Sequence, residues 1–161
     1  MRHGTVTVLV DREILDDGRG SPASHTDYAF EVTTYRVDGV YTDHRRPESV
    51  CFTASLEEDL KRRDFTINAM AYNPEQGVID IFGGQEDLEK GIIRCVGEAS
   101  ERFDEDALRI LRAVRFAAQL DFVIENQTRE AMRDQAKFLK DISAERICTE
   151  LTKMIVSKHP E

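Results

Sequence analysis

The 161-residue chain has no tryptophan, few prolines and few aromatic residues, and its cysteines are sparse. Cys51, Cys95 and Cys148 are odd in number and far apart, no Cys-x-x-Cys occurs, and the histidines are scattered. This distribution gives no basis for a zinc site or a disulfide framework. We therefore expect reduced thiols, as in a cytoplasmic protein.

The sequence also lacks a signal peptide and any apolar run long enough to cross a membrane, so we expect a cytoplasmic protein without a membrane partner. Basic residues are in deficit: 22 Lys and Arg against 31 Asp and Glu give a net charge of −9. This balance argues against broad, nonspecific binding to nucleic acid or to anionic membrane. It does not exclude a local basic patch.

The patterns that are present predict an α+β fold. Alternating apolar residues predict strands over Gly4–Val10 and Tyr28–Val37, paired as a hairpin. Polar segments at residues 11–27 and Asp38–Val50 are expected to be loops. "NAMAYN" and "VIDIF" predict two more strands joined by the turn "NPEQG".

Helices are predicted at several capping signals. Ser55 and Glu58 form a capping-box pattern, in which each side chain bonds the other's backbone N–H, so a helix should begin at Leu56. Later helices are expected to start at Asn126 and Ser143. We expect a mixed domain over residues 1–97 and an all-α domain over residues 98–161.

A row of charged residues lies in "FDEDALRILRAVRF", Phe103–Phe116. The stretch predicts one helix, on which Asp106, Arg109 and Arg112 share a flank. Ordinary helix ion pairs explain such a row on spacing alone. However, arginine offers a rigid fork for phosphate or a base edge, and a neighbouring carboxylate accepts from an exocyclic amine. A ligand site is therefore the second interpretation.

A similar group occurs in "KRRDFTINA". Basic residues at a helix C-terminus suit the helix dipole and need no ligand. Alternatively, Arg63 holds phosphate while Asp64 and Asn68 bond the hydroxyls of a sugar. Asp64 directly follows the helix, and we expect Asn68 at the start of a strand. Together the two groups favour a nucleotide as ligand.

Several long motifs resemble, in the right order, the bacterial tRNA nucleotidyltransferases of the class II CCA-adding enzyme and poly(A) polymerase family, within the DNA polymerase beta superfamily. They are "FEVTTYR", "DHRRPESV", "RRDFTINA", "IDIFGG" and "RFDEDALRILRAVRF". The resemblance implies a partial polymerase-beta-like palm sheet followed by an all-α neck. It also implies template-independent addition of CMP and AMP to the tRNA 3′ end, with CTP, ATP and Mg²⁺.

The resemblance assigns roles to residues of this sequence. Asp106 and Arg109 match the pair that reads the incoming base, and Glu105 would hold Arg109. Glu31 matches the third carboxylate near the metal, as a catalytic and metal-binding residue. The segment around ribose and triphosphate is matched by Arg63, Asp64 and Asn68, with Arg112 close to the nucleotide. Asp38–Val50 matches a flexible loop of members that add the terminal A.

The chain departs from the family because an Asp-x-Asp pair before the first strand, which holds Mg²⁺ in two-metal phosphoryl transfer, is missing. Asp104 and Asp106 cannot replace it, since residues two apart diverge on a helix. We expect an internal fragment that adds no nucleotide by itself. Poly(A) polymerase activity is an alternative. Another is a binding or assembly module that self-associates through unfilled apolar faces, including that of the last helix, Ile147, Leu151, Met154 and Ile155.

Overall fold

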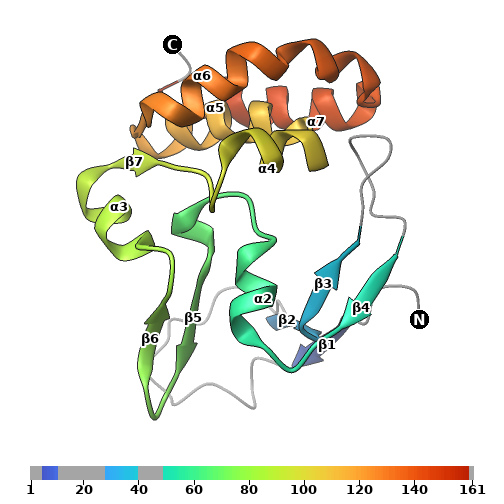
Figure 1. The fold of residues 1–161 in the computed structure, drawn as a ribbon, viewed down its shortest axis with the longest axis vertical. Coiled ribbons are helices and arrows are strands. Elements are labelled where there is room, and N and C mark those ends of the chain that lie inside the picture. The colour runs from blue at the N-terminus through green and yellow to red at the C-terminus, as the bar shows by residue number, and fades with distance from the viewer. Residues whose placement is uncertain (1–4, 11–27, 40–48, 160–161) are drawn as a thin grey trace, which may run out of the picture. The chain divides into compact units, whose positions relative to one another are not determined.

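The computed structural model describes residues 5–10, 28–39 and 49–159 (Figure 1). The chain divides into two compact units, Met1–Tyr35 and Arg36–Glu161, which are described separately below. The predicted loop at residues 11–27 and most of the one at Asp38–Val50 lie outside the described residues. The predicted fold class is confirmed: strands predominate in the first half and helices in the second.

The first unit is an antiparallel hairpin of β1 (Thr5–Val10) and β2 (Tyr28–Thr33). Val6 pairs with Val32 and Val8 with Phe30, which places these apolar side chains on one face. They remain between 42% and 57% exposed. The face that alternation predicted to be apolar is therefore present, but it is not covered within the described residues.

The predicted strand Tyr28–Val37 is wrong as one continuous element. β2 ends at Thr33, and a separate strand, β3 (Arg36–Asp38), pairs with β4 (Val50–Phe52). The strands end separately because the chain changes its pairing partner, from β1 for β2 to β4 for β3. At the start of β3 the backbone N–H of Arg36 donates to Asp59 Oδ1 at 3.2 Å. The short β4 was not predicted, because three residues are too few to show a period.

The second unit continues with α2 (Leu56–Lys61), which begins where the sequence predicted. Ser55 Oγ accepts from the backbone N–H of Glu58 at 3.3 Å, as a capping box requires. The predicted reciprocal bond, from the backbone N–H of Ser55 to the side chain of Glu58, is wrong. Thr53 Oγ1 lies between the partners: it accepts from the N–H of Ser55 at 3.1 Å and donates to Glu58 Oε2 at 2.5 Å.

A short 3₁₀ helix, η1 (Thr66–Asn68), leads into a hairpin of β5 (Met70–Asn73) and β6 (Gly77–Asp80). Asn68 therefore lies in η1 and not at the start of a strand. The hairpin and its turn are as predicted. They are followed by α3 (Gly84–Lys90) and by β7 (Ile92–Ile93), which pairs in parallel with the unpredicted β8 (Val123–Ile124).

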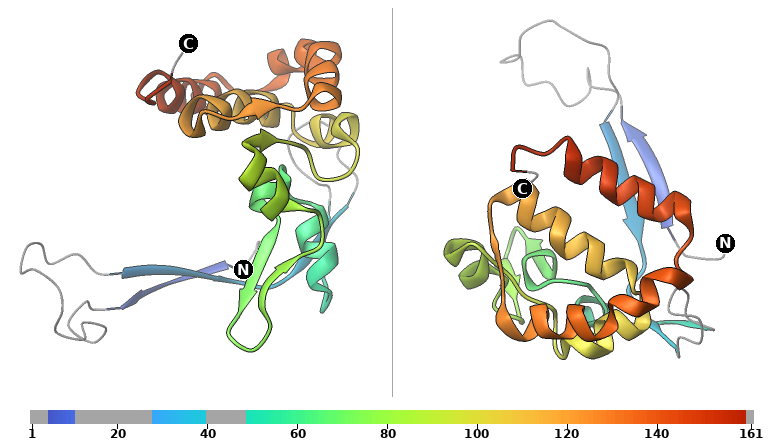
Figure 2. Two further views of the ribbon diagram at one scale, coloured as in Figure 1. Left: turned by 90° about the vertical axis from the view of Figure 1, so that its left-hand side faces the viewer. Right: turned by 90° about the horizontal axis from the view of Figure 1, so that it is seen from above.

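The rest of the unit is helical: α4 (Ala99–Glu105), α5 (Leu108–Leu120), α6 (Asn126–Gln135), the 3₁₀ helix η2 (Ala136–Asp141) and α7 (Ala144–Ile155). Figure 2 shows α4 to α7 gathered at one end of this unit. Glu125, not Asn126, caps α6, because its carboxylate accepts from the N–H of Thr128. Ser143 precedes α7, as expected.

The prediction of a single helix over Phe103–Phe116 is wrong, because the helix is interrupted at Asp106. This residue has extended backbone angles, φ −147° and ψ 102°, and its Oδ1 accepts from the N–H of Leu108 at 3.1 Å. A carboxylate that satisfies a free N–H favours a new helix start over a continuous helix. Asp106 is therefore at a junction between helices and not on a helical flank.

One hydrophobic core joins the two halves of the second unit. Phe65 and Ile93 from the mixed half pack with Phe103 and Ile110 from the helices, and all four are buried. Phe116 lies against Phe65 edge to face, with ring centroids 5.8 Å apart. This core fixes the helices against the segment that follows α2. Among the residues with described positions, no helix is long and apolar enough to span a membrane.

Candidate functional site

A pocket of about 710 Å³ lies in the second unit, where the segment after α2 meets α5 and α7. Most of the residues predicted for a ligand line it. The predicted residues at the pocket are Arg63, Asp64, Asn68, Asp106, Arg109 and Arg112. The other lining residues are Arg62, Leu108, Arg115, Phe116 and Arg146. The two sequence groups, more than thirty positions apart, thus share one cavity with many guanidinium groups.

Asp64 is buried at the wall of this pocket and links both groups. Its Oδ2 accepts from Arg112 Nε at 2.7 Å and lies 2.6 Å from Arg112 Nη2. Its Oδ1 accepts from Asn68 Nδ2 at 3.2 Å and from the N–H of Phe65 at 2.9 Å. The side chains predicted to surround a ribose are therefore already ordered by contacts among themselves.

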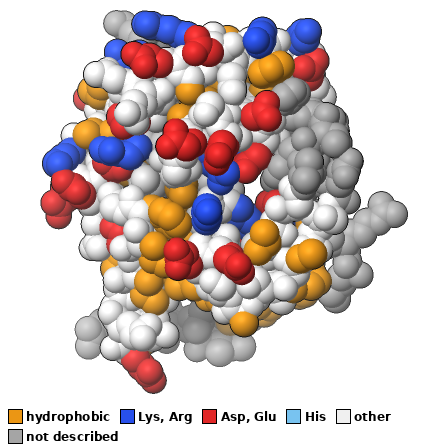
Figure 3. All heavy atoms as spheres, viewed as in Figure 1, with side chains coloured by type: hydrophobic (Ala, Val, Ile, Leu, Met, Phe, Trp, Pro, Cys, Tyr) orange, Lys and Arg blue, Asp and Glu red, His pale blue; other side chains and the backbone are white. Residues whose placement is uncertain are grey.

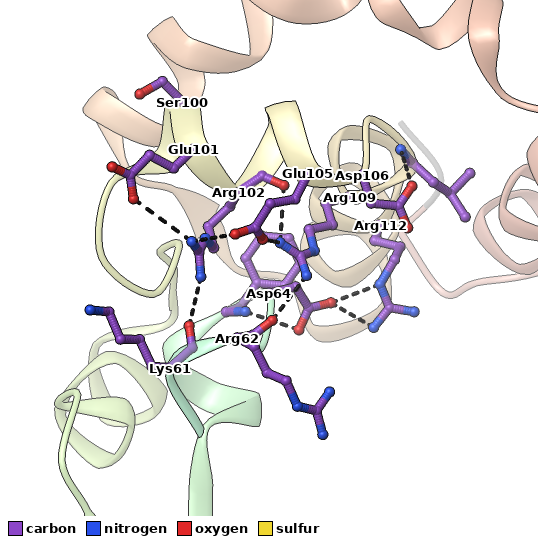
Figure 4. A network of polar contacts seen from close by, with 12 residues as sticks. Lys61, Arg62, Asp64, Ser100, Glu101, Arg102, Glu105, Asp106, Arg109 and Arg112 are labelled. Carbon is purple, nitrogen blue, oxygen red and sulfur yellow. Dashed lines mark hydrogen bonds and ion pairs between the residues drawn. The ribbon is translucent and has the colours of Figure 1, made fainter. Parts of the chain in front are cut away.

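Arg109 is held at the junction between the segment after α2 and the helices (Figure 4). Its Nη2 donates to the carbonyl of Arg62 at 2.9 Å, and its Nη1 donates to the carbonyl of Arg102 at 3.0 Å and to Glu105. Glu105 also binds Arg102 Nη2 at 2.5 Å, while Arg102 Nη1 reaches the carbonyl of Lys61 at 2.7 Å.

These contacts have an electrostatic cause. The carbonyls of Lys61 and Arg62 are at the C-terminal end of α2, which carries the negative end of the helix dipole and attracts guanidinium groups. Of the five N–H donors of Arg109, the bonds above use three. Within the described residues, no hydrogen bond uses the remaining Nη2 hydrogen or the Nε–H of Arg109, a residue that lines the pocket. Glu105 binds Arg109 but does not itself line the cavity.

Asp106 does not pair with Arg109 as helix spacing suggested. Its carboxylate instead binds Arg146 of α7, with Nη2 to Oδ2 at 2.7 Å and Nη1 to Oδ1 at 3.3 Å. The helix break at Asp106 turns this side chain toward α7, which explains the change of partner. Asp106 and Arg109 nevertheless line the same pocket.

Arg63 also has a defined environment. Its Nη2 donates to Asp59 Oδ2 and its Nη1 to the carbonyl of Asn68, both at 3.3 Å. Burial opposes ionisation of Asp59, but bonds and charge from Arg62, with the N–H of Arg36 and with Arg63, outweigh it and lower the pKa of Asp59. Asp59 thus stays charged and keeps the arginines of this wall in place.

Sequence reasoning missed Arg62, Arg115, Phe116 and Arg146 as pocket residues. The guanidinium carbon of Arg115 lies 3.9 Å from the centroid of the Phe116 ring, and that of Arg112 lies 5.4 Å from it. For Arg115 a signal was available, because it continues the spacing of three residues from Arg109 to Arg112. Nothing in the sequence connects Arg146 with Asp106, because forty positions separate them.

Glu31, the predicted metal-binding carboxylate, lies in β2 of the first unit, opposite Thr7. Among the residues that the structure describes, no group of three or more His, Cys, Asp and Glu side chains is placed to hold a metal ion. On the face shown in Figure 3, basic side chains occur in small groups among acidic and hydrophobic ones. This agrees with a local basic site on an acidic protein.

Two family models match the chain. "Poly A polymerase head domain" matches residues 2–94, and "Probable RNA and SrmB-binding site of polymerase A" matches residues 121–161. The CCA-adding enzyme of Lactiplantibacillus plantarum is 50% identical over 160 residues, which cover 99% of this chain and 36% of the relative. That of Geobacillus thermodenitrificans is 51% identical over 154 residues, which cover 96% and 34%.

Solved structures agree with these relatives. The Bacillus stearothermophilus CCA-adding enzyme in complex with CTP matches with a TM-score of 0.79 and 42% identity, over 98% of this chain and 34% of that one. The Thermotoga maritima CCA-adding enzyme complexed with tRNA matches with a TM-score of 0.61 and 40% identity, over 65% and 27%. The chain thus spans about a third of the length of the curated relatives it matches.

Proposed function

The chain belongs to the poly A polymerase head domain family, and from this we propose that it provides the nucleotide-selecting part of a template-independent RNA nucleotidyltransferase. In the complete enzyme the reaction would add CMP and AMP, from CTP and ATP, to the 3′ end of tRNA. The names of the relatives and their complexes with CTP and tRNA support this substrate class.

The observation that carries the proposal is the convergence of most of the predicted nucleotide-binding residues on one pocket. Asp106 supplies carboxylate oxygens, and Arg109 supplies the two N–H donors that its protein contacts leave over. A carboxylate accepts from the exocyclic amine that cytosine and adenine share, and a guanidinium donates to ring nitrogen or oxygen. The protein surface would thus replace a template base.

The remaining pocket residues fit the other parts of a nucleotide. Arg63, with Arg112 nearby, brings positive charge for a triphosphate, whose oxygens match guanidinium forks. Asp64 and Asn68 present polar atoms for ribose hydroxyls in the same pocket. The many arginines concentrate positive charge locally although the chain as a whole is acidic.

Mg²⁺ is proposed only for the complete enzyme. Phosphoryl transfer of this kind uses metal ions that neutralise charge on the phosphates. Glu31 is the one residue of this chain that the family resemblance links to the metal, and a single carboxylate does not make a site. Because the described residues offer no suitable cluster, we derive no step through the ion.

The base-selection proposal is tested with Arg109→Ala. We expect the variant to bind CTP and ATP about tenfold or more weakly, as for the loss of charge-assisted hydrogen bonds, and to discriminate them less from UTP and GTP. Isothermal titration calorimetry with the four triphosphates measures both quantities. Arg129→Ala is the control, because Arg129 is exposed on α6 and does not line the pocket. Unchanged selectivity of Arg109→Ala would reject the proposal.

Two alternatives are also proposed for test. A poly(A) polymerase would bind ATP in this pocket with little affinity for CTP, so the same titration separates it from a CCA-adding enzyme. An assembly module is favoured by the exposed apolar face of the β1–β2 hairpin. The domain limits 1–97 and 98–161, and the inactivity of the isolated chain, stay predictions.

A further inference from the structure

The 3₁₀ helix η1 separates the two side chains that we propose for the ribose. Asp64 precedes η1 and Asn68 ends it, and Asn68 Nδ2 donates to Asp64 Oδ1 at 3.2 Å. Both side chains line the pocket. Thr66 lies between them, is 2% exposed and does not line the pocket. Because so short a 3₁₀ helix has few hydrogen bonds of its own, the contacts of Thr66 decide where this part of the pocket wall lies.

Thr66 is anchored on the side away from the pocket. Its backbone N–H donates to the carbonyl of Arg94 at 3.0 Å, and its hydroxyl donates to Asp87 Oδ2 at 2.6 Å. Asp87 belongs to α3, is 3% exposed and does not line the pocket. A hydroxyl that donates to a charged oxygen makes a short and strong hydrogen bond. This bond therefore fixes η1 against α3.

Asp87 is itself held by Arg94, which follows β7. Arg94 Nε donates to Asp87 Oδ2 and Arg94 Nη2 to Asp87 Oδ1, both at 3.1 Å. A paired fork restricts both the position and the rotation of a carboxylate. Arg94 Nη1 also lies 3.5 Å from an oxygen of Glu125, the residue that caps α6. The buried carboxylate of Asp87 is thus a fixed point from which the Thr66 hydroxyl takes its direction.

We infer that Asp87 is a positioning residue for sugar recognition, which acts through Thr66 on Asn68 and makes the pocket prefer a ribonucleotide over a 2′-deoxyribonucleotide. This inference rests on the proposed function and deepens it. Within the described residues, no hydrogen bond uses Asn68 Oδ1. We assign this oxygen as the acceptor for the 2′-hydroxyl. A shift of η1 would move the acceptor away from the sugar and lose that one hydrogen bond.

Two preferences separate this role from a general structural one. If Asp87 positions Asn68, loss of the Thr66 bond lowers the preference for CTP over 2′-deoxy-CTP. The preference for CTP over UTP stays, because we assign the base to Asp106 and Arg109, which do not contact Thr66 or Asp87 through a hydrogen bond in the described residues. If the bond served stability alone, the two preferences would fall together or not at all.

The experiment compares the 161-residue chain with Thr66→Val, Thr66→Ser and Asp87→Asn, by calorimetric titration with CTP, 2′-deoxy-CTP and UTP and by thermal melting. Valine keeps the shape of threonine without the hydroxyl, whereas serine keeps the hydroxyl. We expect Thr66→Val to lose about threefold to tenfold in ribose preference, as for one neutral hydrogen bond, and Thr66→Ser to retain the preference. Asp87→Asn should lose less, because its amide oxygen can still accept from Thr66.

Glu89→Gln is the matched control for Asp87→Asn, because Glu89 is an exposed carboxylate of the same helix and does not line the pocket. Retained ribose preference in Thr66→Val overturns the positioning role and leaves the proposed function intact. An equal loss in Thr66→Ser, a parallel fall in the preference for CTP over UTP, or a loss in Glu89→Gln does the same.

The unsubstituted chain separates the inference from the function on which it rests. If it prefers CTP over UTP but binds CTP and 2′-deoxy-CTP equally, sugar recognition by this pocket is overturned alone. If it shows no base preference, the proposed function fails and this inference with it. If Thr66→Val melts at a much lower temperature than the unsubstituted chain, the decision passes to Arg94→Lys, which loosens Asp87 and leaves the residues of η1 unchanged. That variant should show the same selective loss of ribose preference, and retention would overturn the inference.

Discussion

At the scale of single residues, the pocket is built from arginines that are each restrained by an acidic side chain. Arg112 is bound by Asp64, Arg109 by Glu105 and Arg146 by Asp106. Sequence predicted the first two arginines, because they fall in recognisable motifs. It could not predict the third, since only the packing of α7 on α5 brings Arg146 to Asp106.

The cysteines differ in a way that is also measurable at this scale. Cys95 is 3% exposed, and burial raises the pKa of its thiol to about 12, whereas Cys51 and Cys148 are exposed. We expect a thiol reagent such as dithionitrobenzoate at pH 8 to modify Cys51 and Cys148 and to spare Cys95, because thiolate is the reactive form. Absorbance of the released thiolate measures the number that react.

The control for this prediction is the same titration in denaturant, where all three thiols should react. Cys95→Ser should keep the two fast thiols and lose the third. A fast reaction at Cys95 in the native chain would contradict the buried position of that side chain.

At the scale of elements, the sequence predicted helix and strand types better than their limits. The helix break at Asp106 was hidden because the apolar period continues from α4 into α5. The short strands β4 and β8 were missed because their pairing depends on distant partners. By contrast, the β5–β6 hairpin and the start of α2 were predicted, since turn and capping residues act locally.

The segment after β6 shows how one element is set by local chemistry. Burial opposes ionisation of Asp80, but the N–H groups of Gln85 and Gly84, each at 2.8 Å, outweigh it and lower the pKa of Asp80. The carboxylate thus supports the start of α3. Gly83 adopts φ +75°, and a Cβ on Gly84 would lie 2.3 Å from the carbonyl oxygen of Thr66. The close packing of α3 on η1 therefore requires glycine.

Gly84→Ala should lower the free energy of unfolding by about 1–3 kcal/mol, because backbone atoms cannot move aside as a flexible side chain can. Urea denaturation followed by circular dichroism measures this. Gln85→Ala is the control, since it changes the next residue of the same helix turn, which is exposed, without adding a Cβ. Similar stability of both variants would show that α3 does not pack closely on Thr66.

At the scale of the whole chain, composition and motifs predicted an acidic α+β protein with a nucleotide site, and the pocket unites most of the residues proposed for it. Sequence could not supply the arrangement of that pocket, because its wall depends on long-range contacts such as those of Arg102 and Arg109 with the end of α2. Glu31 belongs to a separate unit, so the same reasoning does not extend to the metal site.

The last prediction concerns the first unit, whose apolar face is exposed within the described residues. Val8 and Phe30 form a cross-strand pair, 42% and 48% exposed, while Leu9, 66% exposed, lies on the opposite face. A second copy of the same hairpin offers a matching apolar face, so we expect the chain to self-associate at micromolar concentration. Size-exclusion chromatography with light scattering should give more than the mass of one chain. Val8→Thr with Phe30→Thr should restore the monomer, and Leu9→Thr should not. A monomeric unsubstituted chain, or equal dispersal by Leu9→Thr, would exclude this face as the contact.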